Sequence, residues 1–368
     1  IDPLQADTPV DAAVLMLART PLCQVAQLSI KEMPSRSSTS KSIIQLHLGD
    51  RISPNDVEAT FNRLIASRSP YRALLSGVVS WRVSDRHLEI EIDPSWTIDD
   101  LDSSLCHPAL SVLPGPFLRV DQQRFEANVE HPQGRPFLDA VQLSFLTARH
   151  ADRRFRNRKV DVVYGAGDRK SAPRLFASVL VFGSELGQRF RDAVEKTVDR
   201  QFLARFLGAD TTAPMFGLLP ADLGGALSEM DRSPAISPLP GPRQSVTLFF
   251  EAGRSDDRFI AERLQIKLRP FGYRVVLRGV TRKEINDLKI DPSDALLRHV
   301  ALPPSPKVAL AVLRATATGE KETLQPPNLI PLLATALAVT VDAKVKQVEI
   351  DRMGIAHLEN AYWEIDRP

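Results

Sequence analysis

The stretch SELGQRFRDAVEKTVDRQFLARFLG, Ser184 to Gly208, decides the fold, because it is the longest uninterrupted helical signal in the chain. Apolar residues recur along it at helical spacing, so one face is apolar and charged residues fill the other. Ser184 can cap the start of this helix, and Gly208 can end it. On these residues alone it is an ordinary amphipathic helix that faces a core. The apolar face consists of Leu186, Phe190, Val194, Val198, Phe202, Leu203, Phe206 and Leu207.

The composition is that of a folded soluble protein. The chain has 368 residues, 43% of them hydrophobic and 25% charged, which is enough for two or three compact lobes. Lys and Arg outnumber Asp and Glu by only 47 to 45, so nucleic acid is not expected as the main partner. No apolar run approaches the roughly twenty residues that cross a bilayer. We expect at most a peripheral membrane association, a removed signal segment and a periplasmic or other extracytoplasmic location.

The two cysteines, Cys23 and Cys106, belong neither to a disulfide-dense scaffold nor to a zinc site, since no CxxC pair or histidine cluster accompanies them. In an oxidising compartment they could form a disulfide bond. In a reducing compartment they would be small buried hydrophobic residues. The sequence leaves both alternatives open.

No motif supports catalysis or cofactor binding. The seven histidines lie in unrelated segments, and neither an HExxH nor a Gly-x-Ser-x-Gly pattern is present. The segment Gly165 to Ser171 superficially resembles a phosphate-binding loop, but Arg169 stands where such a loop needs a glycine before its lysine. We therefore expect a protein that is not an enzyme and that holds no cofactor or metal.

Two α/β units far apart in the sequence indicate a two-lobed protein. The first is a strand, a charged helix and a strand, and we expect it to form a parallel β-α-β unit. The second has the same order. A further helix begins at Ser53, an N-cap followed by Pro54 at the first helical position. The two units comprise Ala140–Phe145, Ala148–Arg158 and Val160–Val163, then Ser245–Phe250, Asp256–Leu268 and Arg274–Leu277.

Three segments carry a resemblance to a known family. Arg191-Asp192-Ala193 followed by Val198-Asp199-Arg200 resembles the "vR.A...a.DR" helix of the peptide/nickel family of extracellular solute-binding proteins, the receptors that feed ABC importers. LHLGDRISPNDVEATFNRL, residues 46–64, resembles that family's "LR.gvkfhdGtplTAeDVv.s..R" segment. The stretch from Val246 to Val280 resembles its second-lobe signature "l.l.........a..lq..l..iGi.v.l".

The resemblance implies an α/β, two-lobed periplasmic-binding-protein-like fold with an extra small α+β subdomain and a cleft between the lobes. Lobe I would comprise residues 1–22, 112–243 and 341–368, and the accessory subdomain would comprise residues 23–111. A shortened lobe II would comprise residues 244–340. The opening helix would then lie in lobe I, where Arg191, Asp199 and Arg200 would hold the fold together.

Three residues are the candidate ligand contacts. Arg19 and Thr20 stand where the family has an aromatic and an acidic residue beside the ligand, and the planar guanidinium of Arg19 could attract a carboxylate or phosphate. Asp294, within IDPSDALL, stands where the family's aspartate pairs with the amino terminus of a bound peptide. The alternative for Asp294 is an N-cap at the start of a helix.

The implied function is that of a monomeric receptor for a peptide or peptide-like small molecule. A ligand that touches both lobes would favour hinge closure, which the membrane subunits of an ABC transporter would recognise. The alternative is a degenerate binding-protein fold that serves as a structural or interaction protein of the cell envelope, because the short second lobe would have lost its pocket.

Overall fold

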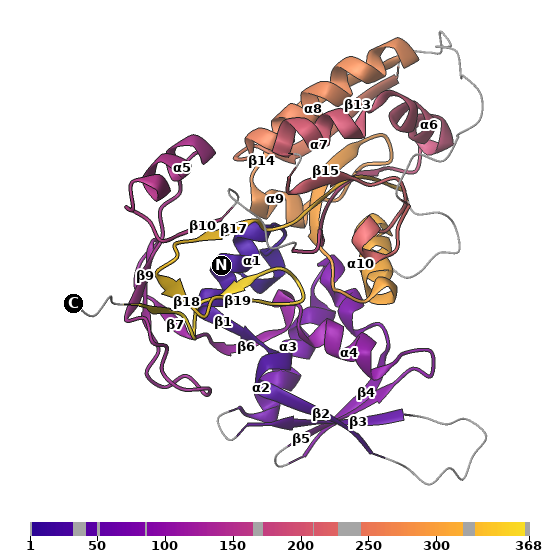
Figure 1. Cartoon of the computed structure of the whole chain (residues 1–368). Coiled ribbons are helices and arrows are strands. Elements are labelled where there is room, and N and C mark those ends of the chain that lie inside the picture. Colours follow the sequence, from indigo (N-terminus) through magenta and orange to yellow (C-terminus); the bar gives the residue numbers. More distant parts are fainter. Residues whose placement is uncertain are drawn as a thin grey trace, which may run out of the picture.

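A computed structural model describes most of the chain (Figure 1). The phosphate-loop-like segment 165–171 and the greater part of the polar loop expected over Lys31 to Lys41 lie outside the described residues. So does the proline-rich stretch 227–243. The described ranges are 2–31, 42–49, 52–84, 87–164, 172–208, 210–226, 244–318 and 328–364.

A six-stranded mixed sheet forms the centre of the second lobe. Its strand β11 (Phe176–Phe182) is buried along its whole length, as expected for a continuous apolar run covered on both faces. It pairs antiparallel with both of its neighbours. The strand order is β12 (Thr212–Pro214), β16 (Leu329–Thr335), β11 (Phe176–Phe182), β15 (Ala295–Ala301), β13 (Gln244–Glu251) and β14 (Tyr273–Val280).

The predicted second β-α-β unit is confirmed. Strands β13 and β14 are parallel, and α8 (Ser255–Leu268) connects them. Helix α8 buries Ile260, Leu264 and Leu268 in an apolar cluster with side chains of the sheet. The short helices η5 (Arg269–Phe271), α9 (Arg282–Asp287) and η4 (Ala221–Leu223) belong to the same lobe.

The stretch from Ser184 to Gly208 forms two helices where one was predicted. These are α6 (Gly187–Thr197) and α7 (Arg200–Gly208). The backbone is extended at Val198, and the Asp199 carboxylate accepts a hydrogen bond from the Phe202 amide at 2.8 Å, which starts a new helix. Ser184 lies outside α6, whereas Gly208 ends α7 with a φ of +125°, as predicted.

The boundary between the lobes differs from the expected one. Strands β11 and β12 are hydrogen-bonded to β15 and β16, so residues 176–214 lie in the second lobe and not, as expected, in lobe I. The lobes are joined by a two-stranded ribbon of β10 (Val162–Tyr164) and β17 (Val339–Val341). We therefore define lobe I as the described residues up to 164 and from 339, and lobe II as those from 172 to 338. Strand pairing is non-local, and the apolar pattern of β11 carries no information on which sheet it joins.

The lower part of lobe I is a four-stranded antiparallel sheet covered by helices (Figure 1). The predicted cap is present, because the Ser53 hydroxyl accepts a hydrogen bond from the Asn55 amide and Pro54 is the first helical residue. The elements are β2 (Ala26–Lys31), β3 (Ser42–Leu48), α3 (Pro54–Ala66), η2 (Pro70–Leu75), β4 (Val78–Val83), β5 (His87–Ile92) and α4 (Ile98–Leu105).

The rest of lobe I consists of short elements from both ends of the chain. These are η1 (Pro3–Gln5), α1 (Pro9–Ala18), β1 (Arg19–Pro21), α2 (Leu22–Val25), η3 (Pro108–Leu110), β6 (Ser111–Pro114), β7 (Phe117–Arg119), β8 (Arg124–Ala127), β9 (Ala140–Gln142), α5 (Ala148–Arg156), β18 (Val345–Lys346), β19 (Glu349–Ile350), β20 (Ala356–His357) and β21 (Tyr362–Trp363).

The first predicted β-α-β unit is wrong. Strand β9 pairs antiparallel with β8, and β10 pairs antiparallel with β17, so the two strands flanking α5 lie in different sheets. The physical reason lies in α5, whose side chains with described burial are all partly or fully exposed. A helix with no buried apolar face cannot cover a parallel sheet.

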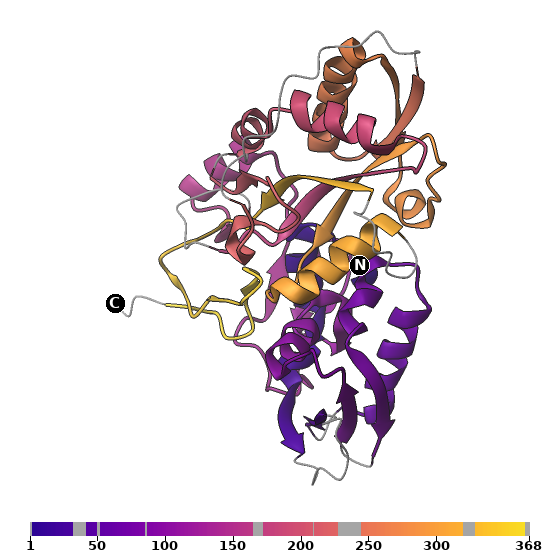
Figure 2. The same cartoon turned by 90° about the vertical axis from the view of Figure 1, so that its right-hand side faces the viewer.

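Helix α10 (Pro306–Thr318) connects the cores of the two lobes. It packs on η2 and α4 of lobe I and on β11 and β16 of lobe II. In Figure 2 it is the orange helix between the purple lobe I and the upper sheet. One apolar cluster runs through this contact and contains Tyr71 and Leu110 from lobe I together with Val308 and Val312 from lobe II.

Candidate functional site at the boundary between the lobes

The lobe boundary is held by buried hydrogen bonds to the last residue of β15. The Ala301 amide donates to the Tyr71 hydroxyl at 3.0 Å, and this hydroxyl donates to Oδ1 of Asp7 at 2.7 Å. The Ala301 carbonyl lies 3.1 Å from Nε2 of His107. Tyr71, His107 and Ala301 are all fully buried. Two lobe I side chains therefore occupy both backbone hydrogen-bonding groups of a lobe II residue.

The protonation states of these groups follow from their partners. Nδ1 of His107 accepts from the Ala109 amide at 3.1 Å, so the proton is on Nε2 and is donated to Ala301. Burial lowers the pKa of His107 to about 4, so its imidazole is neutral at pH 7. Burial, and then the neighbouring Asp7, raise the pKa of Tyr71 well above its ordinary value.

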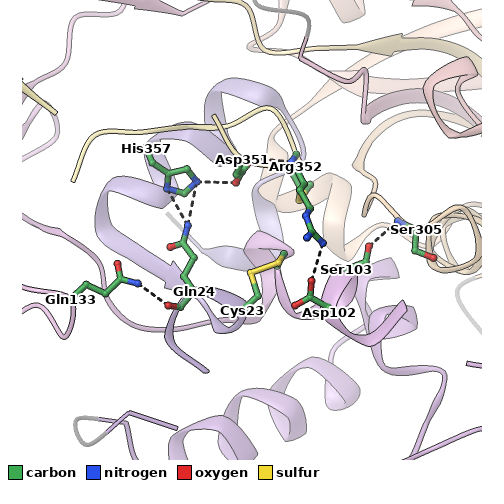
Figure 3. Close-up of a disulfide and its surroundings, with 11 residues drawn as sticks. Cys23, Gln24, Asp102, Ser103, Gln133, Ser305, Asp351, Arg352 and His357 are labelled. Atoms are coloured by element: carbon green, nitrogen blue, oxygen red, sulfur yellow. Dashed lines mark hydrogen bonds and ion pairs between the residues drawn. A yellow bond between two sulfur atoms is a disulfide. The ribbon is translucent and has the colours of Figure 1, made fainter. Parts of the chain in front are cut away.

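Further polar contacts cross the boundary, among them an ion pair and a serine–serine hydrogen bond. Arg282 of α9 binds Asp11 of α1 at 2.8 Å and Glu251 of its own lobe at 3.1 Å. Burial by itself lowers the pKa of Arg282, but its bonds to the two carboxylates outweigh burial and raise it. The Ser305 amide donates to the hydroxyl of Ser103 at 2.8 Å (Figure 3). Together with the shared apolar cluster, these contacts fill much of the lobe boundary with side chains.

An open cavity of about 680 Å³ lies at one side of this boundary. Lobe I contributes Arg68, and lobe II contributes the remaining residues. Its apolar wall includes Phe249, over whose ring the Arg278 guanidinium lies at 5.5 Å. The cavity is lined by Arg68, Phe249, Arg278, Val280, Lys283, Glu284, Leu288, Lys289, Asp291 and Asp294. Cations and carboxylates in one cavity suit a ligand that carries both charges.

Asp294 is the sequence-predicted residue that lines this cavity. It directly precedes β15, so the alternative in which it caps a helix is wrong. Its Oδ1 accepts a hydrogen bond from the Thr247 amide at 3.2 Å, and its backbone is held by bonds to Asp291 and Gly183. One carboxylate oxygen is thus fixed to the neighbouring strand.

Arg19 and Thr20 lie elsewhere. Arg19 lines a separate pocket of about 300 Å³ within lobe I, between α1 and strands β6 to β8. Thr20 is 2% exposed, and its hydroxyl lies 3.2 Å from Nε2 of His131. Successive residues of a strand point to opposite faces, so these two side chains diverge. The structure does not bring the three predicted residues together.

A buried polar cluster beside Thr20 was not predicted. Nδ1 of His131 and the hydroxyl of Tyr164 are buried without a hydrogen-bond partner among the described residues. The charge of Glu359 acts on the pKa of both, although burial has the larger effect on each. The sequence signal was weak, because the histidines were dispersed and the C-terminal segment showed no periodicity.

His357 lies between two carboxylates of the C-terminal segment and beside Gln24 of the N-terminal part of lobe I. Its Nε2 lies 2.9 Å from Asp351 and its Nδ1 lies 3.3 Å from Glu359. Burial lowers the pKa of His357, but hydrogen bonds and charge from the two carboxylates raise it to about 10. Figure 3 shows His357 beside Gln24, the residue that follows Cys23 in the chain.

The Cys23–Cys106 disulfide is formed, with a Cα–Cα distance of 4.9 Å. It joins α2 to the end of α4 (Figure 3). Of the two alternatives that the sequence left open, the structure therefore has the oxidised one.

A row of Ser178, His299 and Asp257 has the composition of a catalytic triad. The Ser178 hydroxyl lies 3.0 Å from Nδ1 of His299, whose Nε2 lies 2.7 Å from Asp257. Ser178 is 6% exposed in the middle of β11, and it lines neither the inter-lobe cavity nor the lobe I pocket. The row fixes α8 to the sheet. Within the described ranges, no group of three or more His, Cys, Asp or Glu side chains is arranged to hold a metal ion.

Comparison with known proteins gives structural matches only. No protein-family model matches the sequence, and no curated protein matches it. Among solved structures, the PBP AgaA from A. tumefaciens R10 in complex with agropinic acid matches with a TM-score of 0.68 at 12% identity, over 100% of this chain and 96% of that one. Listeria monocytogenes OppA bound to peptide matches with a TM-score of 0.64 at 12% identity, over 98% and 96%. NikA from Staphylococcus aureus in complex with Ni(L-His)2 matches with a TM-score of 0.63 at 13% identity, over 97% of each chain.

The chain has the fold of the peptide/nickel solute-binding proteins of ABC importers. In this binding-protein fold, the β10–β17 ribbon carries the chain between the lobes, and the 680 Å³ cavity lies where residues of both lobes meet. Arg191 and Asp199 serve the fold as expected, although in lobe II and not in lobe I, whereas for Arg200 the structure shows burial alone. Arg191 donates to the Leu329 carbonyl, Asp199 starts α7, and Arg200 is 3% exposed. No helix within the described residues is both long and apolar enough to span a membrane.

Proposed function

We propose that the chain is a solute-binding receptor of an ABC importer that binds a peptide or peptide-like zwitterion in the inter-lobe cavity. The observation that carries the proposal is the lining of this cavity, where Arg68 of lobe I and Asp294 of lobe II border the same space. The free oxygen of Asp294 would pair with a ligand ammonium group. Arg68 and Arg278 would bind its carboxylate, for which a guanidinium is well shaped.

The receptor would act by favouring the closed arrangement of its lobes. A ligand that contacts Arg68 and Asp294 adds binding energy only when the lobes are together, so it shifts the population toward that state. The membrane subunits of the importer would recognise this state. The protein would act as a monomer, without a cofactor and without enzymatic activity.

An extracytoplasmic location agrees with the disulfide. Disulfide bonds persist in oxidising compartments such as the periplasm and are rare where glutathione and thioredoxin keep thiols reduced. The Cys23–Cys106 bond supports export of the chain independently of the cavity.

A melting screen tests the receptor proposal. A ligand at a hundred times its Kd stabilises a protein by about 2.7 kcal/mol, which shifts the melting temperature by several degrees. We expect such a shift with short peptides or amino-acid derivatives, and we expect Asp294→Asn and Arg68→Gln to abolish it. Asp256→Asn is the matched control, because Asp256 is exposed on α8 away from the cavity lining. A shift that both cavity variants retain would disprove this site.

The second candidate is an interaction protein of the cell envelope that no longer takes up a solute. It is favoured by the buried contacts of Tyr71 and His107 with Ala301, in which the chain's own side chains tie the lobes together. X-ray scattering with and without the peptides and amino-acid derivatives of the screen discriminates the two candidates. A receptor becomes more compact when it binds. A scaffold gives the same curve throughout, shows no melting shift and co-purifies with a protein partner.

A further inference from the structure

Helix α5 is the most basic segment of the chain. Residues 149–159, RHADRRFRNRK, hold six Arg or Lys residues and one Asp, a net charge of +5 against +2 for the whole chain. The rest of the chain therefore carries a net charge of −3, so the positive charge is concentrated in this segment.

The cations of α5 are available to an external partner. Arg156 pairs with Asp152 at 2.9 Å. Arg149, Arg153 and Arg154 are exposed, and their side chains have no ion pair with any residue that the structure describes. Figure 1 shows α5 projecting from the body of lobe I.

Exposed apolar side chains adjoin this basic helix. Phe145 is 65% exposed and Leu146 is 40% exposed, and both directly precede the N-cap residue Thr147. Large apolar side chains next to a row of arginines are typical of segments that lie in a membrane interface, with the apolar groups inserted and the cations at the headgroups.

Two backbone hydrogen bonds hold the C-terminal end of α5. The Arg158 amide donates to the Phe155 carbonyl at 2.8 Å, and the Lys159 amide donates to the Arg154 carbonyl at 2.9 Å. Arg158 adopts a left-handed conformation with a φ of +55°. Because the helix and its end are already ordered, binding costs little conformational entropy.

We propose that Phe145, Leu146 and the arginines of α5 form a docking surface for an anionic lipid membrane. The charge is complementary to anionic headgroups, to which each basic residue near the surface adds attraction. Lipid is favoured over nucleic acid for two reasons. The exposed Phe145 and Leu146 gain from insertion between lipids, and the Cys23–Cys106 disulfide is typical of oxidising compartments outside the cytosol, where membranes and not genomic DNA are the main anionic surface. The surface would hold the protein beside the membrane whether or not the inter-lobe cavity binds a solute.

Vesicle sedimentation tests this surface on the full chain. We expect binding to vesicles that contain phosphatidylglycerol, weak binding to pure phosphatidylcholine, and release as the salt concentration rises. Arg153→Gln with Arg154→Gln removes two charges and should weaken binding about twenty- to thirtyfold. Phe145→Ser should weaken it several-fold and leave the salt dependence in place. The control is Arg269→Gln with Arg274→Gln, which removes two exposed cations of lobe II and should leave binding unchanged.

Melting curves of each variant show whether it is folded, and since α5 is exposed, we expect the same melting temperature for all of them. Equal loss of binding in the control pair would mean that overall charge, and not α5, is responsible, and would overturn the proposal. Equal binding to both vesicle types would also overturn the proposal. The same holds if the chain binds duplex DNA through α5 but does not bind vesicles.

Discussion

Replacing Tyr71 with Phe tests whether the two lobes form one cooperative unit. The substitution keeps the buried ring, which packs on His107 with the ring centroids 4.6 Å apart, and removes only the hydroxyl. The Ala301 amide loses its hydrogen-bond partner in a fully buried site, and Asp7 loses one in a partly buried site. An unsatisfied buried donor costs about 1–3 kcal/mol of stability, and the lost hydrogen bond to the carboxyl group costs about 1 kcal/mol more. We expect the free energy of unfolding to fall by about 2–4 kcal/mol.

Urea unfolding measures this loss, with the midpoint expected to fall and the slope to stay the same. The wild-type chain should unfold in a single transition, because the apolar cluster runs through both lobes. Tyr362→Phe is the matched control, since Tyr362 is 39% exposed and should change stability by less than about 0.5 kcal/mol. A loss in Tyr71→Phe no larger than in the control would refute the reasoning, as would separate transitions for the two lobes in the wild type.

Three other predictions follow from the buried ionisable groups and the disulfide. The pKa of His107 is about 4 in the folded chain and about 6.5 in the unfolded chain, so between these pH values the unfolded state binds one proton more. The free energy of unfolding should therefore fall by up to about 3 kcal/mol as the pH drops from 6.5 to 4. Melting temperatures measured against pH test this, and His107→Gln should make them depend less on pH. The pKa of His357 is raised to about 10, so the charged imidazole stabilises the folded state fully below pH 6.5, and this stabilisation is lost as the pH rises through 10. An NMR titration of His357 with an ordinary midpoint near 6.5 would contradict this. Cys23→Ser with Cys106→Ser opens a loop with a sequence separation of 83 and should lower stability by about 4–5 kcal/mol in the chain-entropy description, measured by urea unfolding; an unchanged midpoint would show that the loop is constrained without the bond.

The sequence predicted local elements better than their partners. The cap at Ser53, the α8 helix and the parallel pairing of β13 with β14 were all predictable, because each depends on residues close in sequence. The placement of β11 was not predictable, since its buried run fits any sheet covered on both faces. The split between α6 and α7 was missed because an aspartate inside an amphipathic pattern resembles a surface residue until its carboxylate is seen to cap a new helix.

The candidate site was predictable only in part. Asp294 was singled out by resemblance and lines the inter-lobe cavity, whereas its neighbour Arg68 comes from the loop after α3 and has no pattern around it. Thr20 was also singled out, but its burial against His131 depends on a segment more than a hundred residues away. Contacts between distant segments determine which polar side chains face a cavity, and a single sequence does not contain them.

The disulfide has a consequence for how the chain can be cut. Cys23 and Cys106 enclose the four-stranded sheet of lobe I as one covalent ring. A protease that cleaves one peptide bond within residues 24–105 therefore releases no fragment, and the nicked chain migrates as two pieces only after reduction. Without the disulfide, cleavage at a surface loop in this region would separate the chain into two fragments. With the disulfide, the two fragments remain covalently joined and can stay folded together.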